Sequence, residues 1–482
     1  MEWKPNRNIS MPVYRQIAAY IEERISCGEL PPGSLLPSER ELAQLLQVNR
    51  STVVSAYDQL RSFGIVQREQ GSGTRVSKDM WGSSKVRVPN WKRMIDTGAF
   101  ASNQPLMQTI RKVVQECNAN MIDLASGELA ESLYPTEALR RIIAEQSFDM
   151  PFGYGHLQGY YPLRQTLAEQ EHHMKQIDCT PSSILITSGV QQALHLVAQC
   201  LLKAGDTVAI ENPSYCYSLP MFHKAGIRTC LLSVDRHGID PEQLVQLHRK
   251  QRIKMIFVNP NYHNPTGTVL SYERRLRLLH ISAEYGIPIV EDDPYSLTSY
   301  DGQVVPTLKS LDRNGSVLYI SSLTKIVSSG IRMGWVIGPQ AVIERLTDAK
   351  QQIDFGHSVV SQWVANQFIR SDAYTTHLIR LRRELKQRKD AVISSLQQMR
   401  AQGIPIEELA EPQGGIHVWC KLHATFPASR LLKEAIQRDV IYVPGIAMGQ
   451  DERCVRFSYG KATPAQLEAA LQRFSAAWAA CN

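Results

Sequence analysis

The sequence lacks the features of a membrane-spanning or a disulfide-stabilised protein. No apolar run approaches the ~18 residues that a membrane-spanning helix requires, and the stretch MEWKPNRNISMPVYRQ has no apolar signal core. The nine cysteines include no C-x-x-C pair and no metal-like cluster, and their odd number argues against a complete disulfide framework. We therefore expect a cytoplasmic protein with reduced thiols, no metal and no membrane partner.

A strong excess of one charge is also missing. The formal net charge is +7 over 482 residues. It amounts to +1 in residues 1–80, +4 in residues 81–120 and +2 in the remainder. Because this excess is small and lies mainly in one short segment, composition alone gives only a weak indication of nucleic-acid binding. The length and the 43% of hydrophobic residues allow several globular domains with real cores.

The strongest chemical signal lies in Val317–Val336. An apolar run predicts a buried strand that delivers Ser322, Thr324 and Lys325, and Arg332 follows seven residues after the lysine. A lysine amine can form a Schiff base with an aldehyde, while hydroxyl groups and an arginine can hold a phosphate. A pyridoxal phosphate (PLP) site needs this combination. For the S-x-T-K stretch alone, a surface lysine beside polar turn residues is the alternative.

The first eighty residues have the pattern of a winged helix-turn-helix. Ser38 and Glu41 form a capping box, and Leu42, Leu45 and Leu46 form the expected apolar face of the helix that follows it. The residues that open the next helix would enter the major groove of DNA. Helical periodicity and strand signals predict three helices and then a two-stranded wing, at about Val13–Ile25, Ser38–Gln47, Arg50–Phe63, Ile65–Arg68 and Thr74–Val76.

Three ordered patterns in this segment resemble the GntR family of regulators: LPSERELA, R-S-T-V-x-x-A-Y-x-x-L and G-S-G-T-R-V. The alternative for each piece is a solvated helix-end charge or an ordinary hairpin turn, but these alternatives do not explain the ordered set. The resemblance implies DNA contacts from one residue of the second helix, the first residues of the third helix and the wing, namely Arg40, Arg50, Ser51, Thr52 and Gly71.

From about Met121 onward, short apolar runs alternate with helical stretches. This alternation predicts an α/β domain with a mainly parallel sheet covered on both faces. Ligands in such sheets gather at the carboxyl ends of the strands. The expected strands are Ile184–Thr187, Thr207–Ile210, Lys254–Asn259, Pro288–Glu291, Ser316–Ile320 and Met333–Ile337, with a further strand around Gly414–Trp419 in a smaller C-terminal subdomain.

Polar groups follow four of these strands. Ser188-Gly189 leads into a helix whose N-terminus can receive a phosphate, and Asn264 stands in an N-P-T-G turn. Asp292 at a strand end could keep a pyridine nitrogen protonated, and Tyr215 could stack on the ring. A helix cap, a turn-forming Asp-Asp-Pro and a core tyrosine are the alternatives for the separate pieces.

Together with S-x-T-K and G-I-R-M-G, these motifs resemble the fold-type I aminotransferases. The resemblance implies that Lys325 forms the Schiff base and that Arg456 grips the carboxylate of an amino compound. His156 departs from the family pattern in Y-G-x-x-x-G, where an aspartate is more usual. The resemblance assigns the remaining contacts with PLP to Asp292, Tyr295, Asn264, Tyr215, Val190, Gln191, Ser322, Thr324 and Arg332.

The whole chain resembles the MocR subfamily of GntR regulators, with a winged helix in residues 1–78, a linker in 79–118 and an aminotransferase-like domain in 119–482. The resemblance implies a head-to-tail homodimer that binds promoter DNA and responds to an amino-compound effector, or to PLP itself. The alternative is an active PLP-dependent aminotransferase with an accessory winged-helix domain. The intact set of DNA-contact residues favours the regulator, because an enzyme does not need it.

Overall fold

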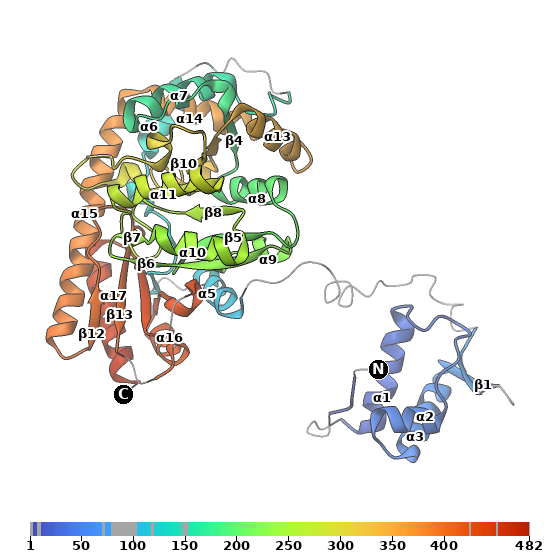
Figure 1. Ribbon diagram of the computed structural model, residues 1–482. Helices are drawn as coiled ribbons and strands as arrows, with labels where there is room; N and C mark the ends of the chain where they lie inside the picture. Colours follow the sequence, from blue (N-terminus) through green and yellow to red (C-terminus); the bar gives the residue numbers. More distant parts are fainter. Residues whose placement is uncertain are drawn as a thin grey trace. The chain divides into compact units, whose positions relative to one another are not determined.

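The computed structural model describes residues 3–6, 11–69, 73–78, 104–116, 120–145, 147, 153–423, 426–449 and 452–481. The chain divides into two compact units, Met1–Phe100 and Ala101–Asn482. Figure 1 shows both units, and each is described here by itself. No helix among the described residues is both long enough and apolar enough to cross a membrane.

Within its described residues, the smaller unit has three helices followed by a two-stranded hairpin. Ser38 caps the helix α2 (Glu39–Leu46) through the predicted capping box with Glu41. Ile17, Leu42 and Tyr57 are buried in its core, and the Tyr57 hydroxyl donates to the Pro37 carbonyl at 2.7 Å. The hairpin strands pair antiparallel. The elements are α1 (Val13–Ser26), α2 (Glu39–Leu46), α3 (Arg50–Ser62), β1 (Val66–Glu69) and β2 (Gly73–Val76), which confirms the winged helix-turn-helix.

The prediction that Leu45 belongs to the core of the smaller unit was wrong. Its side chain is 49% exposed, whereas Leu42, Ala43 and Leu46 are buried. On a helix of two turns, Leu46 lies between Leu42 and Ala43, and Leu45 falls on the far side of Leu42. The small Ala43 side chain lets this face approach the rest of the domain closely.

The larger unit is built on a mixed sheet of eight strands, in the order β4-β11-β10-β9-β8-β5-β6-β7. The five strands from β10 to β6 run parallel, and β11 is antiparallel to both of its neighbours. This confirms the mainly parallel sheet. The strands are β4 (Ile184–Thr187), β5 (Thr207–Asn212), β6 (Arg228–Asp235), β7 (Gly238–Ile239), β8 (Met255–Val258), β9 (Ile289–Asp292), β10 (Val317–Ser322) and β11 (Gly334–Ile337).

Helices cover both faces of this sheet (Figure 1). On one face α8 (Val190–Leu201), α9 (Met221–Lys224) and α13 (Gln340–Gln351) share a hydrophobic cluster with the strands. On the other face α10 (Pro241–Gln251), α11 (Tyr272–Tyr285) and α12 (Leu308–Leu311) form a second cluster. Because both faces are buried, the central strands read as continuous apolar runs, which explains why they could be predicted.

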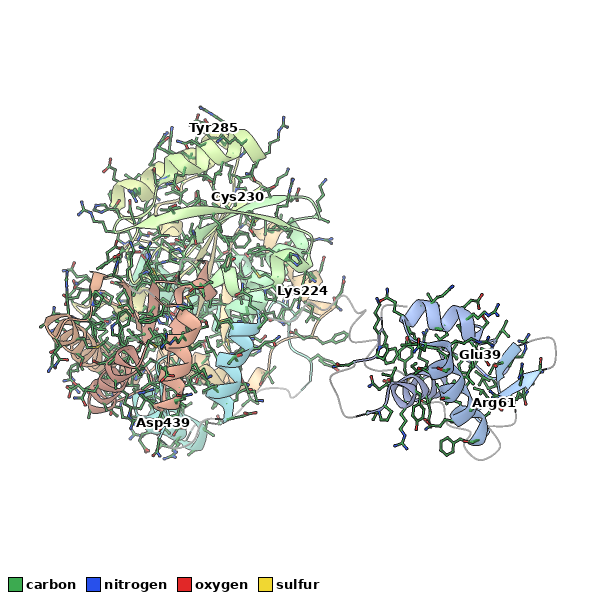
Figure 2. The ribbon with its side chains drawn as sticks, turned by 90° about the horizontal axis from the view of Figure 1, so that it is seen from below. Glu39, Arg61, Lys224, Cys230, Tyr285 and Asp439 are labelled. Atoms are coloured by element: carbon green, nitrogen blue, oxygen red, sulfur yellow. The ribbon has the colours of Figure 1, made fainter. Side chains whose placement is uncertain are left out.

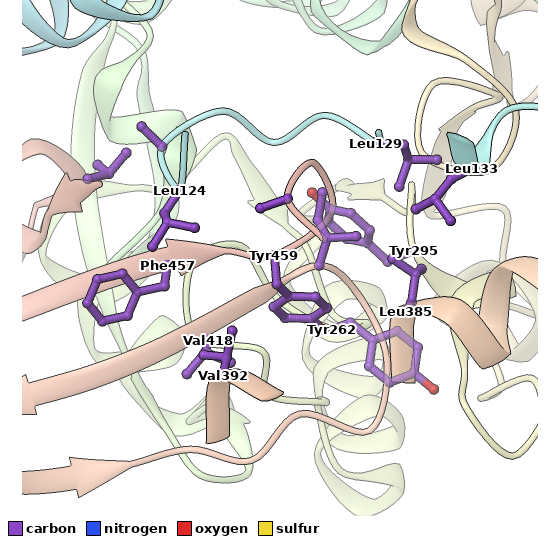
Figure 3. Packing of buried hydrophobic residues seen from close by; sticks show 14 of the residues in the cluster. Leu124, Leu129, Leu133, Tyr262, Tyr295, Leu385, Val392, Val418, Phe457 and Tyr459 are labelled. Atoms are coloured by element: carbon purple, nitrogen blue, oxygen red, sulfur yellow. The ribbon is translucent and has the colours of Figure 1, made fainter. Parts of the chain in front are cut away.

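A smaller subdomain is formed mainly by the chain after the long helix α15 (Asp372–Ala401), together with the earlier strand β3. Its sheet has the order β12-β13-β16-β15, and a separate pair joins β3 to β14. Figure 3 shows Leu124, Val418, Phe457 and Tyr459 packed together from distant parts of the sequence. The elements are β3 (Ile122–Asp123), β12 (Ile406–Leu409), β13 (His417–Leu422), α16 (Ala428–Gln437), β14 (Val440–Ile441), β15 (Val443–Pro444), β16 (Cys454–Ser458) and α17 (Pro464–Ala479).

The part of the larger unit that the structure describes has four further helices. The first, α5 (Pro105–Glu116), lies within the segment 79–118 that the sequence indicated as a linker. It buries Ile110 against the main core, and Met107 and Val114 pack beside it. The others, α6 (Thr136–Glu145), α7 (Tyr161–Lys175) and α14 (Val359–Arg370), pack around one end of the sheet near β4.

Candidate functional site

A pocket of about 480 Å³ opens at the carboxyl ends of the parallel strands. It lies where the large sheet meets the smaller subdomain, because β10 and β16 both contribute to its lining. All eleven residues that the sequence assigned to a cofactor or an effector line it, namely Val190, Gln191, Tyr215, Asn264, Asp292, Tyr295, Ser322, Thr324, Lys325, Arg332 and Arg456.

Lys325 stands in the turn after β10, where the strand delivers its side chain into the pocket. The amine donates a hydrogen bond to the carbonyl of Gly127, which comes from the segment after β3. Burial lowers the pKa of the amine to about 8, and the nearby guanidinium groups of Arg456 and Arg332 act in the same direction. A lysine in this state is a far better nucleophile at neutral pH than an ordinary one.

Asp292 ends β9, with its carboxyl group buried beside the pocket. Oδ2 accepts a hydrogen bond from the Tyr215 hydroxyl, while Oδ1 has no hydrogen-bond partner among the described residues. Burial raises the pKa of this carboxyl to about 7, and neighbouring Asp293 adds to the effect. A buried carboxylate oxygen without a partner is costly, so the site is incomplete without a ligand that offers a hydrogen-bond donor.

Another part of the pocket is suited to an anion. Gly189 is the N-cap of α8 with a φ of 104°, and no side chain caps this helix. A Cβ at Gly189 would lie 3.2 Å from Arg332 Nη2, which itself donates to the Ser188 carbonyl at 2.8 Å. Uncapped N–H groups at a helix N-terminus beside an arginine and two hydroxyl groups, those of Ser322 and Thr324, form a phosphate-binding arrangement.

Arg456 on β16 is a buried cation without an ionic partner among the described residues. Nη1 donates to Asn264 Oδ1 at 2.9 Å and Nη2 donates to the Ala125 carbonyl, while Nε has no partner. Burial lowers the pKa of this guanidinium to about 10. Because a buried charge held only by neutral oxygens is unfavourable, the site favours an anionic ligand at Arg456.

Two residues of the site were missed by the sequence analysis. His417 on β13 is buried behind Tyr295, with Nε2 at 3.0 Å from the Tyr295 hydroxyl and Nδ1 at 3.0 Å from Ser458 Oγ. Burial lowers the pKa of this imidazole well below its usual value, so it is neutral. Asp123 accepts from the backbone N–H groups of Ala125 and Ser126, both at 2.9 Å, and so fixes the turn that faces Lys325 and Arg456. For His417 the available signal was a histidine directly before the apolar residues Val418 and Trp419.

Replacing His417 with phenylalanine is expected to lower the free energy of unfolding of the larger unit by about 1–3 kcal/mol, because two buried hydroxyl groups lose their partner. Urea denaturation measures this change. Ser458→Ala removes only one of the two contacts and is expected to cost less. If His417→Phe is as stable as the original protein, the hydrogen bonds from His417 to Tyr295 and Ser458 have no structural role.

His156, the departure from the aminotransferase pattern, does not line the pocket. It is exposed, and its Nδ1 accepts from the Gln158 N–H at 3.2 Å. Neighbouring Tyr154 is 87% exposed and packs on Phe355, with 5.5 Å between ring centroids. The structure thus assigns His156 a local turn contact and no contact with the site.

In the smaller unit, the candidate DNA-contact residues stand at the exposed start of two helices. Arg40, Arg50 and Ser51 are exposed and Thr52 is partly buried. Arg50 donates from Nε and Nη2 to Glu39 Oε2, at 3.2 and 2.9 Å. Figure 2 labels Glu39, the first residue of α2, and Arg61, near the end of α3. The wing residue Gly71 lies outside the described residues.

Comparison with known proteins identifies both units. Residues 13–76 match the gntR family of bacterial regulatory proteins, and residues 119–474 match aminotransferase class I and II. The HTH-type transcriptional regulator YisV of Bacillus subtilis is 36% identical over 477 residues, which cover 98% of this chain and 97% of that protein. The chain belongs to the same family of HTH-type transcriptional regulators as YisV. The regulator has the two-domain architecture of the MocR subfamily, and the smaller unit is its DNA-binding domain.

Further relatives support both parts of the regulator. The HTH-type transcriptional regulator NorG of Staphylococcus aureus (strain USA300) is 28% identical over 433 residues, covering 88% of this chain and 95% of that protein. The kynurenine aminotransferase of Pyrococcus horikoshii, in complex with PMP, superposes with a TM-score of 0.75 at 27% identity, covering 81% of this chain and 98% of that chain. LysN, the α-aminoadipate aminotransferase of Thermus thermophilus, complexed with N-(5'-phosphopyridoxyl)-L-leucine, superposes with a TM-score of 0.71 at 27% identity. The match covers 81% of this chain and 99% of that chain.

Proposed function

We propose that this regulator binds PLP in the pocket, senses an amino compound there and changes its binding to promoter DNA in response. The observation that carries the proposal is the combination in one pocket of a lysine amine of lowered pKa, an unpartnered buried carboxylate oxygen and a buried arginine without an ionic partner among the described residues. Each of these features is unfavourable alone. The lysine amine matches the aldehyde of PLP, the carboxylate oxygen matches its protonated pyridine nitrogen, and the arginine matches the carboxylate of an amino acid.

The residues present fit PLP. Asp292 Oδ1 lacks a donor that a protonated pyridine nitrogen would supply. The α8 N-terminus, Ser322, Thr324 and Arg332 would hold the phosphate, with contacts from the backbone of Val190 and from Gln191. Two aminotransferases of this fold, at 27% identity, are named for complexes with PMP and a phosphopyridoxyl compound.

When bound, PLP supplies an aldehyde that captures amines and a ring that accepts electrons. The chain's own residues prepare this chemistry. Lys325 offers its neutral amine, and Asp292 keeps a proton on the ring nitrogen. Tyr295, whose hydroxyl is held by His417, would donate a hydrogen bond to the phenolic oxygen. The Asn264 amide would bind the same oxygen, and Tyr215, which donates to Asp292, would stack its ring on the cofactor.

An amino-compound effector would be bound by both parts of the larger unit. Its carboxylate would pair with Arg456 on β16, whereas its amine would lie near Lys325 after β10. The affinity for such a ligand depends on the spacing between the large sheet and the smaller subdomain, because the ligand contacts both. A ligand that binds two spacings with different affinity shifts the population between them, and this shift is the signal to the DNA-binding domain.

The DNA-binding part of the proposal rests on Arg40, Arg50, Ser51 and Thr52, with Gly71 of the wing as an expected further contact. The first residues of α3 would read base edges, and Arg40 would contact phosphate.

We propose a head-to-tail homodimer, since a dimer would present two such domains to paired half-sites. The exposed aromatic pair Tyr154 and Phe355 is a candidate part of the dimer contact.

The proposal is tested by measuring DNA affinity at fixed salt. A fluorescent duplex, selected from a random pool by the PLP-loaded protein, is titrated in the presence of single amino acids and amines. We expect one compound to change the Kd by about fivefold or more, in line with typical coupling free energies. The same titration of the apoprotein serves as the control. If no compound in a broad panel changes the Kd of the loaded protein more than that of the apoprotein, effector sensing through PLP is wrong.

The uptake of PLP should depend on pH through Lys325. Only the neutral amine reacts, so the uptake rate should rise with pH and level off above a pKa of about 8. The rate at pH 7 should be about tenfold below the plateau, because roughly a tenth of an amine with this pKa is neutral there. Stopped-flow absorbance measures the rate. A rate that keeps rising to pH 10 would instead indicate an ordinary lysine.

A working aminotransferase is the second candidate. The complete set of pocket residues favours it, because no group needed to bind PLP is missing from the described lining. The winged helix does not fit this candidate. The two functions differ in one measurable property, which is continued turnover with an oxo-acid acceptor.

A further inference from the structure

The turn that leads into α8 is held by two side chains that contact the backbone of one residue, Ser188. The Ser188 carbonyl accepts a hydrogen bond from Arg332 Nη2 at 2.8 Å. The Ser188 N–H donates to Gln192 Oε1, also at 2.8 Å. The next residue, Gly189, is the N-cap of α8 and has no side chain that could cap the helix. The position of this helix N-terminus therefore depends on the two side chains that hold Ser188.

Gln192 also connects this turn to the segment between α13 and α14. Its Nε2 donates to Asp354 Oδ2 at 2.6 Å. The other carboxylate oxygen, Asp354 Oδ1, accepts from the Gly356 N–H at 3.0 Å and from Lys350 Nζ. Lys350 lies on α13 and is only 1% exposed. Because a buried ammonium group needs an anionic partner, this ion pair fixes the carboxylate that Gln192 contacts.

These contacts reach the phosphate-binding arrangement without touching a ligand. Neither Gln192 nor Asp354 is among the residues that line the pocket. They act on the pocket through Ser188, which precedes Gly189 and binds Arg332. A shift of Ser188 would therefore displace the α8 N-terminus and the arginine together. Several donors bind one phosphate only while their positions agree, so such a shift would weaken the binding of a phosphate.

We propose that Gln192 and Asp354 are positioning residues for the cofactor phosphate, because they hold the Ser188 turn in the place where the α8 N-terminus and Arg332 donate together. This inference rests on the proposed function and adds residues that support the same site from outside the pocket. The alternative is that both residues only stabilise the fold around Lys350. The two roles differ in ligand selectivity. A general loss of stability weakens PLP and pyridoxal alike, whereas a loss of phosphate positioning weakens PLP alone.

The test compares PLP with pyridoxal, which has the same aldehyde and ring but no phosphate. The apparent Kd of each compound is measured by titration of the visible absorption band at fixed salt. We expect Gln192→Met to weaken PLP binding by about three- to tenfold, as for the loss of one hydrogen bond, and to change the pyridoxal Kd by less than about twofold. Gln199→Met, the matched change at an exposed glutamine of the same helix, should alter neither value.

Asp354→Asn tests the next contact of the series. The carboxylate uses one oxygen for Lys350 and Gly356 and the other for Gln192, whereas an amide has one acceptor oxygen. We expect this oxygen to stay with the buried lysine, so that Gln192 loses its acceptor. The PLP Kd should then rise by about two- to fivefold, with the pyridoxal Kd unchanged. Urea denaturation measures the stability of each variant, and if one of them does not fold, the other still decides the test.

The outcomes separate this inference from the proposed function. If Gln192→Met changes the Kd of PLP and of pyridoxal by the same factor, or changes neither, the inference fails while binding of PLP in the pocket stands. An unchanged PLP Kd in a folded Asp354→Asn protein would remove Asp354 from the assignment. If the original protein gives no absorption band of bound PLP, the proposed function itself fails.

Discussion

Lys325→Ala is expected to abolish the visible absorption band of protein-bound PLP. No other lysine lines the described part of the pocket, so no second amine is placed to replace it. Lys433→Ala, which changes an exposed lysine on α16, should leave the band intact. Borohydride reduction of the loaded protein, followed by peptide mapping, should place the cofactor on the peptide that contains Lys325. An undiminished band in the Lys325 variant would overturn the assignment of the cofactor site.

Arg50→Ala is expected to weaken specific DNA binding by roughly five- to hundredfold, the range expected when one good base contact is lost. Its side chain opens α3 and is oriented by two hydrogen bonds from its guanidinium to Glu39. Binding to unrelated DNA should change much less, because phosphate contacts dominate non-specific affinity. Arg61→Ala is the control, since Arg61 lies at the far end of the same helix and pairs with Asp58.

The two variants should act on separate functions. Arg50→Ala should retain full PLP occupancy, and its visible spectrum should match that of the original protein. Specific binding that survives Arg50→Ala at an unchanged Kd, measured by fluorescence anisotropy at one salt concentration, would count against α3 as the recognition helix.

The parts of the site that could be predicted share one property, which is local encoding. Lys325, Arg332 and Asn264 each follow a buried strand in a short motif, so a few neighbouring residues identify them. The sheet then brings the strand ends together, because parallel strands end at the same edge. The buried central strands were predicted to within about two residues for the same reason.

The parts that could not be predicted depend on contacts between distant segments. The partner of the Lys325 amine is a carbonyl 198 residues away, at Gly127, and His417 meets Tyr295 only when β13 packs against the large sheet. Several charged residues lie near Arg50 in the sequence, and their spacing alone does not predict that Arg50 pairs with Glu39. Leu45 shows the same limit at short range, because burial on a short helix depends on which face meets the core.

Helix α5 illustrates why a connecting segment is difficult to interpret from sequence. Its apolar positions have helical spacing, but they occupy only three turns after a long stretch without periodicity. They become informative once the core that receives Ile110 is known. The contribution of α5 to the pocket lining follows from that packing and from no motif.

The most direct test of sensing against enzymatic turnover is the visible absorption spectrum of the PLP-loaded protein. It is titrated with amino acids and amines in the presence of an oxo-acid acceptor, while product formation is followed in the same sample. We predict that at least one compound converts the spectrum to a stable new form, without continuing oxo-acid consumption. Continued oxo-acid consumption at a typical enzyme rate, roughly 1–1000 s⁻¹, would contradict the sensor hypothesis and favour an active aminotransferase.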